Sequence, residues 1–209
     1  AEDTRHTVGK VDNLYSLRYY HSHIPEHENI LTSFKPYLNS NYFGHKEKTH
    51  QWGCDILTTI GMDQSSELPW DAVRPHILNG GYQIIKSFIP ECKYTIEISA
   101  LWANIYERYD FQEIHDHVNL NTHFSFAYIL ECDDLDTSSK FQFYNDCTFM
   151  KHIFPHRHFA DPICDTLFRP TQRQGTLLVF PSNLKHHVTQ HLSNNRRTTI
   201  SGNLSVSFE

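Results

Sequence analysis

The spacing of apolar residues changes its period near Pro90, and this change restricts the fold more than any other feature of the sequence. Before Pro90, apolar residues recur at helical spacing, most clearly between Asp71 and Ile89. After it, they alternate with polar residues, first over Lys93–Ile105, as in strands with one buried face. Further strand-like segments lie at 123–130, 140–144, 176–180 and 200–208. Helices followed by such a series of short strands predict a mainly β fold with N-terminal helices, and we favour a jelly roll, or double-stranded β-helix.

The chain is predicted to form a single domain whose first part supports the second. Residues 1–92 would provide an N-terminal arm and a helical support, and residues 93–209 the jelly-roll core with a metal site. A short helix is expected at 27–38, ahead of the longer one. Gly80 and its neighbour Gly81 are expected to weaken the middle of the longer helix, where they could also split it.

Composition and charge narrow the set of partners. The net charge is −6 with neutral histidine, so the broad basic surface that binds duplex nucleic acid is not expected. No stretch approaches the roughly 18 apolar residues of a transmembrane helix, so no membrane partner is predicted. The five cysteines are scattered and never spaced as C-x-x-C, which argues against a disulfide framework and a thiolate zinc site. We therefore expect a cytoplasmic protein.

Histidine is the outlier of the composition, with 16 copies in 209 residues. Three pairs have the spacing H-x-H, whereas chance gives about one at this histidine content. These pairs are His21/His23, His115/His117 and His156/His158. His115 and His117 lie next to a predicted strand, where residues two apart share one face and can bind one metal ion. His186 follows the predicted strand 176–180 and could meet them at one mouth of a barrel, the alternative being solvated loop histidines.

An arginine pair precedes the last predicted strand. Arg197 is the second of the two arginines, and Thr199 follows it by two residues. An arginine inside a barrel can bind a carboxylate through two parallel hydrogen bonds, with a hydroxyl group beside it. The alternative, and the commoner case, is a pair of arginines at an exposed hairpin.

Several short motifs follow one another in the second half of the chain, each at a predicted strand or strand end. They are Trp102-Ala103-Asn104, His115-Asp116-His117, SFAYIL at 125–130, GTLLVFPSNLKHHV at 175–188 and RTTISGN at 197–203. In this order they resemble the 2-oxoglutarate/Fe(II)-dependent oxygenase superfamily, and more narrowly a group of oxygenases of phages and bacteria. The resemblance covers residues 94–208, whereas residues 1–93 carry no matching motif.

The resemblance implies a double-stranded β-helix with Fe(II) and 2-oxoglutarate bound in its mouth. It also implies an enzyme that hydroxylates its substrate while 2-oxoglutarate is converted to succinate and CO2, a chemistry that the cofactor carries. By position in the motifs, the implied metal ligands are His115, His117 and His186. The implied cosubstrate residues are Arg197 for the distal carboxylate, Thr199 beside it, and Asn104 and Tyr128 in the pocket.

The second histidine of the H-x-H motif departs from the superfamily pattern, which has an acidic residue at that position. One explanation is a site of three neutral histidines, which can hold Fe(II) but also zinc. Another makes Asp116 a ligand, which requires a bulge or a loop because adjacent strand residues point to opposite faces. We prefer the first explanation and give little weight to a third pair, His117 and Asn119.

Three smaller features carry expectations of their own. Phe126 follows Ser125 where the family has glycine, and Gly202 stands where it has phenylalanine, which indicates either a packing exchange or a reshaped pocket. His187 is expected to point away from the metal, as a structural or supporting residue. The histidine-rich segment 149–162 could cover the site, although a solvated loop is the preferred expectation.

Two other classes of protein remain open at this point. A cupin-like protein would hold iron or zinc with three histidines and lack 2-oxoglutarate chemistry. The H-x-H motif favours this class, and Arg197 with Thr199 argues against it. A non-catalytic, phage-type jelly-roll protein would use the fold as a scaffold and bind neither metal nor 2-oxoglutarate.

Overall fold

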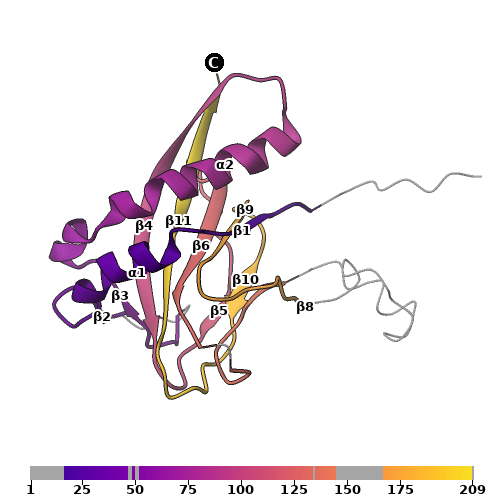
Figure 1. The fold of residues 1–209 in the computed structure, drawn as a ribbon. Helices are drawn as coiled ribbons and strands as arrows, with labels where there is room; N and C mark the ends of the chain where they lie inside the picture. The colour runs from indigo at the N-terminus through magenta and orange to yellow at the C-terminus, as the bar shows by residue number, and fades with distance from the viewer. Residues whose placement is uncertain (1–16, 47–48, 50–51, 134, 145–166, 209) are drawn as a thin grey trace, which may run out of the picture.

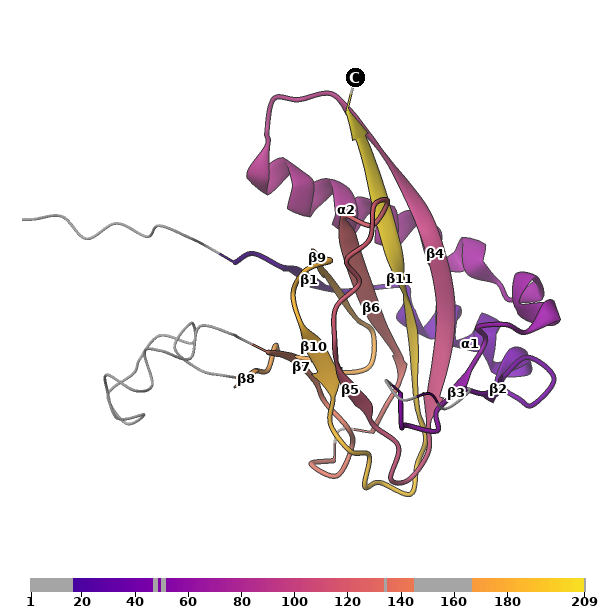
Figure 2. The same cartoon turned by 180° about the vertical axis from the view of Figure 1, so that it is seen from behind.

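A computed structural model of the chain describes residues 17–46, 49, 52–133, 135–144 and 167–208. These residues form three layers, namely two helices, a large antiparallel sheet and a smaller antiparallel sheet (Figure 1). Seen from behind, the smaller sheet lies on the side of the large sheet that the helices leave open (Figure 2). The fold is therefore the mainly β jelly roll, or double-stranded β-helix, with N-terminal helices that the sequence predicts.

The elements of the described residues have the following bounds. The large sheet contains β1 (Tyr20–His23), β2 (Gly44–His45), β3 (Leu57–Thr58), β4 (Tyr94–Tyr106), β6 (Phe124–Glu131), β9 (Thr176–Pro181) and β11 (Arg197–Phe208). The smaller sheet contains β5 (Gln112–His115), β7 (Phe141–Tyr144), β8 (Leu167–Phe168) and β10 (His186–Val188). The α-helices are α1 (His27–Phe34) and α2 (Arg74–Phe88), and 3-10 helices lie at Lys35–Tyr37, Asp63–Glu67 and Trp70–Ala72. The strand orders are β1-β9-β6-β11-β4-β3-β2 and β5-β10-β7-β8.

The predicted strands are present, and their observed ends differ from the predicted ones by a few residues. The largest shift is at β11, which begins at Arg197 because the residues before position 200 continue the pairing with β4. Strands β2 and β3 were not predicted, because two residues are too few to show a period. Helix α1 ends at Phe34 and passes into a 3-10 turn that contains Pro36, which cannot donate a helical hydrogen bond.

The glycine pair in α2 does not split the helix, contrary to one expectation from the sequence. A Cβ atom on Gly80 would lie 2.9 Å from Val179 Cγ2, and one on Gly81 would lie 2.9 Å from Leu204 Cδ1. The two glycines therefore let α2 approach the large sheet closely, and this packing offsets their low helix propensity of about 1 kcal/mol each. No helix in the described part of the chain is long and apolar enough to span a membrane.

The large sheet buries a different kind of surface on each face. Toward the helices, alternate residues of β4 and β11 belong to the main apolar core. These residues are Ala103, Ile105, Ile200, Leu204 and Val206, with Ile96 from the outer part of β4. Between the two sheets lie two smaller apolar clusters, one around Phe141 and Phe180 and one around Ile56 and Val188. The interior of the jelly roll is thus only partly apolar, and the remaining space holds polar groups.

Gly202 on one strand makes room for the large side chain of Phe126 on the neighbouring strand. The two residues are directly paired between β11 and β6. A Cβ atom on Gly202 would lie 2.5 Å from Phe126 Cζ and closer still to the Ala100 carbonyl oxygen. Of the two explanations that the sequence left open, the packing exchange is the one that the structure supports.

Candidate metal centre

Two paired strands of the large sheet present a row of polar and aromatic side chains toward the smaller sheet. The register pairs Arg197 with Tyr106, Thr199 with Asn104, and Ser201 with Trp102. Because side chains alternate along a strand, these six residues share one face, and all of them line one cavity between the sheets.

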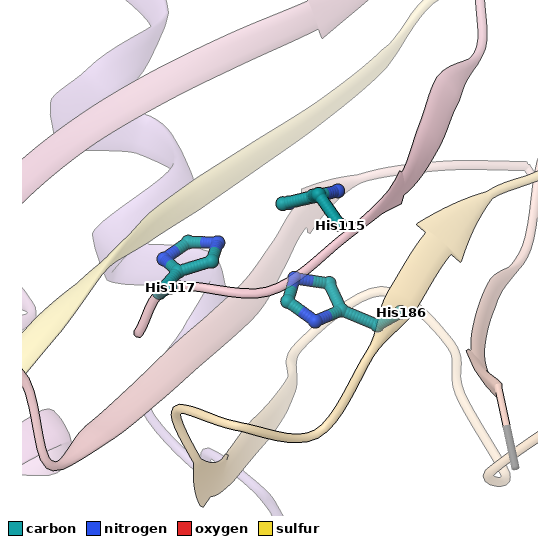
Figure 3. Close-up of side chains that lie close together, drawn as sticks. All are labelled: His115, His117 and His186. Atoms are coloured by element: carbon teal, nitrogen blue, oxygen red, sulfur yellow. The ribbon is translucent and has the colours of Figure 1, made fainter. Parts of the chain in front are cut away.

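Three histidines enter the same cavity from the side of the smaller sheet (Figure 3). His115 ends β5, His186 begins β10, and the two residues are directly paired. His117 lies two residues beyond β5, where its backbone N–H donates a hydrogen bond to the Ser182 carbonyl at 2.9 Å. The metal-binding nitrogens of the three histidines lie within 4.8 Å of one another. The sequence placed His186 at the exit of β9, whereas it begins a further short strand that was not predicted.

Each of the three imidazole rings is held through its Nδ1 atom. The acceptors are the Glu113 carbonyl for His115 (2.7 Å), the Leu184 carbonyl for His186 (2.9 Å) and Asn203 Oδ1 for His117 (2.7 Å). A carbonyl oxygen can only accept, so Nδ1 carries the proton and Nε2 keeps its lone pair. Metal-bound histidines generally donate their other N–H group in this way.

Burial keeps these histidines in the neutral form that metal binding requires. It lowers the pKa of His115 to about 4, against the opposing effect of the hydrogen bond to the Glu113 carbonyl. It also lowers the pKa of His186 well below the ordinary value, and the neighbouring His115 acts in the same direction. The pKa of His117 is lowered as well, again mainly by burial. At neutral pH no proton has to leave these side chains before a cation binds.

Arg197 is a buried cation that faces the cavity. Its side chain is 1% exposed, and its guanidinium carbon lies 5.2 Å from the centre of the Tyr106 ring. Its Nη1 atom has no hydrogen-bond partner, and no carboxylate among the described residues forms an ion pair with it. Burial lowers the pKa of Arg197, but a guanidinium group stays protonated in proteins. A buried charge without an opposite charge costs several kcal/mol, so this part of the cavity is suited to an anion.

Tyr106 and Gln112 line the cavity but were not among the site residues predicted from the sequence. The Tyr106 hydroxyl donates a hydrogen bond to Gln112 Oε1 at 2.9 Å. Burial raises the pKa of Tyr106 to about 12, although the charge of Arg197 opposes this, so the hydroxyl remains a donor at neutral pH. Tyr106 could have been found, because it lies two residues after Asn104 and therefore on the same strand face. No pattern in the sequence identifies Gln112.

Of the predicted cosubstrate residues, Asn104 and Thr199 line the cavity, whereas Tyr128 does not. Tyr128 belongs to the apolar core beneath the helices, and its hydroxyl lies 2.5 Å from His27 Nδ1. The expectation that Tyr128 lines the pocket was therefore wrong. The alternation of β6 turns this side chain to the opposite face of the sheet.

Asp116 lies between two of the clustered histidines but is not part of the cluster. Its Oδ1 atom accepts a hydrogen bond from the Val118 backbone N–H at 3.2 Å. Asn119 likewise makes a local turn contact, with its Oδ1 accepting from the Asn121 N–H at 2.9 Å. Of the ligand sets that the sequence left open, the geometry brings together the three histidines.

The histidines that flank His186 have partners elsewhere. His187 Nε2 lies 2.8 Å from the side-chain amide of Gln142, and His187 does not line the cavity. His191 is fully buried, and its Nδ1 accepts a hydrogen bond from the Ser139 N–H at 3.0 Å. The remaining H-x-H pairs are His21/His23, on the edge strand β1, and His156/His158, which lie with the whole of segment 149–162 outside the described residues.

The fold and the site together define a jelly-roll protein with a candidate metal centre. A family model described as "Putative 2OG-Fe(II) oxygenase" matches residues 100–203, which run from β4 to β11 and include the three histidines and Arg197. The chain belongs to the 2-oxoglutarate/Fe(II)-dependent oxygenase superfamily. The narrower resemblance to phage and bacterial oxygenases stays a prediction. No curated protein shows a significant match to this chain.

Solved structures of similar fold cover nearly the whole chain. A prolyl-4-hydroxylase from Pseudomonas putida has a TM-score of 0.54 at 12% identity, over 91% of this chain and 93% of that chain. The carbocyclase SnoK from nogalamycin biosynthesis has a TM-score of 0.59 at 10% identity, over 92% of this chain and 82% of that chain. HygX from Streptomyces hygroscopicus, with nickel, 2-oxoglutarate and hygromycin B bound, has a TM-score of 0.57 at 9% identity, over 90% of this chain and 83% of that chain. At these identities the likeness establishes the fold alone.

Proposed function

We propose that this chain is an Fe(II)- and 2-oxoglutarate-dependent oxygenase that hydroxylates a small molecule or a peptide and releases succinate and CO2. The observation that carries the proposal is one cavity that holds three converging neutral histidines and a buried arginine with an unpartnered Nη1 atom. A cation and a carboxylate would satisfy both features at once. The family match supports Fe(II) and 2-oxoglutarate as that pair.

The residues present fit these two ligands. Imidazole nitrogen is a good donor for Fe(II), and three neutral rings leave the charge of the cation to be balanced by an anion. A dicarboxylate supplies that anion and has a second carboxylate left for Arg197. Bound together, Fe(II) and 2-oxoglutarate supply the oxidising chemistry, in which O2 yields succinate, CO2 and one oxygen atom for the substrate.

The chain's own residues would orient the cosubstrate. Arg197 would hold the distal carboxylate through its free Nη1 N–H, because a charge-assisted hydrogen bond of this kind is strong in a buried site. Thr199 and Tyr106 line the same cavity and offer hydroxyl groups, and Tyr106 remains protonated. Asn104 is the direct strand partner of Thr199 and lines the cavity beside it.

Aromatic rings shield one side of the histidine cluster from water. The centre of the His186 ring lies 5.2 Å from that of Phe141 and 4.9 Å from that of Phe180. Both phenylalanines are buried in the apolar cluster between the sheets. Such a wall lowers the local dielectric constant, which strengthens the interaction of the site with charged ligands.

Of the reactions considered, hydroxylation requires the fewest additional groups in the site. It needs a substrate C–H bond near the metal and no further reacting side chain. Epimerisation requires a hydrogen donor on the opposite face of the carbon, and ring closure requires a second reactive position of the substrate within bonding reach. We therefore propose hydroxylation for this chain, although related folds occur in an epimerase and a carbocyclase.

A metal protein without 2-oxoglutarate chemistry is the second candidate. The three-histidine set favours it, because three neutral imidazoles also suit zinc. It gives no role to the buried charge of Arg197, which is why we rank it second.

Calorimetric titration of 2-oxoglutarate into metal-free, zinc-loaded and anaerobic Fe(II)-loaded protein separates the two candidates. The proposal predicts much tighter binding to the metal-loaded forms than to the metal-free form, and succinate by NMR once oxygen is admitted to the Fe(II) form. Metal binding without any heat from 2-oxoglutarate would favour the second candidate. Absence of metal binding would contradict both.

A further inference from the structure

A second cleft opens outside the histidine cluster and shares a wall with the inner cavity. We call it the outer cleft, and it is lined by Lys46, Trp52, Ile56, Ile60, Trp102, Asn104, Gln112, His115, Asp116, His117, Val118, Asn119 and Asn203. Its volume of about 350 Å³ lies within the range of small-molecule sites. Because His115 and His117 belong to both spaces, a molecule in the outer cleft would lie against the candidate metal centre.

Two indole rings stand against the histidines in this cleft. The Trp52 ring meets His115 edge to face, with ring centres 5.0 Å apart. The Trp102 ring stacks on His117, with centres 5.8 Å apart and planes at 20°. Such rings provide rigid apolar surface to a ligand at little entropic cost.

The segment that carries Trp52 is tied to the smaller sheet. The backbone N–H groups of Gly53 and Cys54 donate to Glu113 Oε1, at 2.5 and 3.0 Å. Glu113 precedes His115 on β5 by two residues, so the same strand holds the indole and the histidine in place. The position of Trp52 is thus built into the fold.

Lys46 adds a single positive charge to this apolar wall. Its ammonium nitrogen lies 3.6 Å from the centre of the Trp52 ring. Burial lowers the pKa of Lys46, while the nearby Glu113 carboxylate opposes this effect. No ion pair joins Lys46 to a carboxylate among the described residues. The neighbouring Glu113 carboxylate accepts two backbone N–H groups at Oε1, while its Oε2 has no hydrogen-bond partner. The ammonium group therefore has hydrogen-bond capacity left for a ligand.

The rest of the cleft is apolar or neutral, with one exception. Ile60 and Val118 are exposed on its rim, at 55% and 64%. Asn119 and Asn203 contribute amides without charge. The exception is the exposed carboxylate of Asp116, which is engaged with the Val118 N–H. Lys46 is accordingly the only cation of the cleft among the described residues, if the neutral histidines are set aside.

We propose that the outer cleft binds the substrate of this enzyme, and that this substrate is an organic anion with an aromatic or apolar body. Lys46 would pair with its carboxylate or phosphate, and Trp52 and Trp102 would contact its body beside the metal. This inference rests on the proposed function, because it assigns the substrate class of the same site. From the overall charge of −6 alone, a cationic or neutral ligand would be expected. The positive charge of Lys46 inside the cleft favours an anionic ligand instead.

The test uses three probes that share one body and differ in charge, namely 3-phenylpropionate, 3-phenylpropionamide and 3-phenylpropylamine. Each is titrated into the metal-free full chain and followed by tryptophan fluorescence. The chain has three tryptophans, of which two line the cleft and the third, Trp70, lies in the core. Trp52→Phe and Trp102→Phe therefore identify which indole reports binding.

We expect quenching by all three probes in the order acid, amide, amine. The acid should bind about fivefold more tightly than the amide, which corresponds to about 1 kcal/mol for a partly exposed ion pair. Lys46→Gln should make the acid and the amide equal. Lys86→Gln, an exposed lysine on α2, should leave the preference unchanged. Equal or reversed affinities in the native chain, or no quenching by any probe, would overturn the inference. Repeating the series with phenyl phosphate and phenol distinguishes a phosphate from a carboxylate.

The same protein preparation is also titrated with Fe(II) and 2-oxoglutarate. If these two bind but the acid shows no preference over the amide, the substrate class is wrong and the proposed function stands. If the acid preference depends on Lys46 but 2-oxoglutarate does not bind, the cleft assignment survives and the oxygenase proposal fails. The two failures are therefore distinguishable.

Discussion

The two faces of the large sheet come from the same strands and yet bury opposite kinds of surface. Toward the helices, β4 and β11 present aliphatic side chains that are almost fully buried in one core. Toward the smaller sheet, the intervening positions present Asn104, Tyr106, Arg197 and Thr199. The first face needs only packing to be stable, whereas the second buries a charge and several polar groups that packing does not require.

The difference indicates where stability and function lie in this molecule. Burying polar groups without partners costs free energy. Such groups are found where a bound ligand supplies the missing hydrogen bonds and where other contacts stabilise the fold. Here the apolar face of the same strands provides those contacts. Variants on the helix-facing side should therefore change stability and spare ligand binding, and variants on the cavity side should do the reverse.

The largest contrast is expected between His186→Ala and Ile200→Ala. His186→Ala should abolish metal binding, because the remaining two histidines form an incomplete site. Ile200→Ala should leave the bound metal unchanged and lower the free energy of unfolding by about 2–5 kcal/mol, because it opens a cavity in the core. Elemental analysis and urea unfolding measure the two effects. Full metal occupancy in His186→Ala would show that the ligand assignment is wrong.

The next effect concerns the buried cation. Arg197→Gln should weaken 2-oxoglutarate binding roughly a hundredfold, about 3 kcal/mol, because a buried charge pair loses one partner. Its metal content should not change. Arg196→Gln is the matched control, because Arg196 is exposed and pairs with Glu131 at 3.0 Å. Calorimetry on both variants checks this, and equal affinities in the two would remove Arg197 from the cosubstrate site.

A smaller effect is expected at Asn203, whose Oδ1 accepts a hydrogen bond from His117 Nδ1. Asn203→Ala should lower the metal affinity about tenfold, because His117 loses the group that fixes its ring and tautomer. Asn203→Asp should retain the affinity, since a carboxylate accepts the same hydrogen bond. Competition with a chelator measures the affinities, with Ser207→Ala at the exposed end of β11 as the control. If Asn203→Ala bound metal as the native chain does, Asn203 would have no positioning role.

An effect of similar size, on stability in place of metal affinity, is expected on the helix-facing side at Gly202. Gly202→Ala should lower the free energy of unfolding by about 1–3 kcal/mol, because the new methyl group meets Phe126 and the Ala100 carbonyl. Its metal affinity should be unchanged. Combining it with Phe126→Leu should recover part of the lost stability, as measured by urea unfolding of the metal-free chains. If the two substitutions lowered the free energy of unfolding additively, Gly202 and Phe126 would not compensate each other in size.

Much of the fold follows from local patterns in the sequence. The long strands β4 and β11 alternate over many residues, and α1 shows its buried Ile30, Leu31 and Phe34 at helical spacing. Short elements such as β10 carry no period of their own and form because a partner strand is present. The intact α2 was also not predictable from propensity, because the close approach to the sheet decides the effect of its glycines.

The histidines and Arg197 could be placed in one site through motif order, but their supporting residues could not. The alternation of β4 predicts that Tyr106 shares a face with Asn104, and this inference was open to sequence reasoning. The same rule would have separated Tyr128 from the cavity, had the inward face of β6 been known. Gln112 and Asn203 act through contacts between distant segments, and only the three-dimensional structure gives those.

The central claim is that one cavity binds Fe(II) and 2-oxoglutarate together. The most direct measurement is an anaerobic titration of the metal-free protein with Fe(II) and then 2-oxoglutarate, followed by visible absorption. The account predicts a charge-transfer band that requires both components, is absent in His186→Ala and is lost or strongly weakened in Arg197→Gln. A band that stays at full strength in Arg197→Gln, or metal binding without any band, would contradict it.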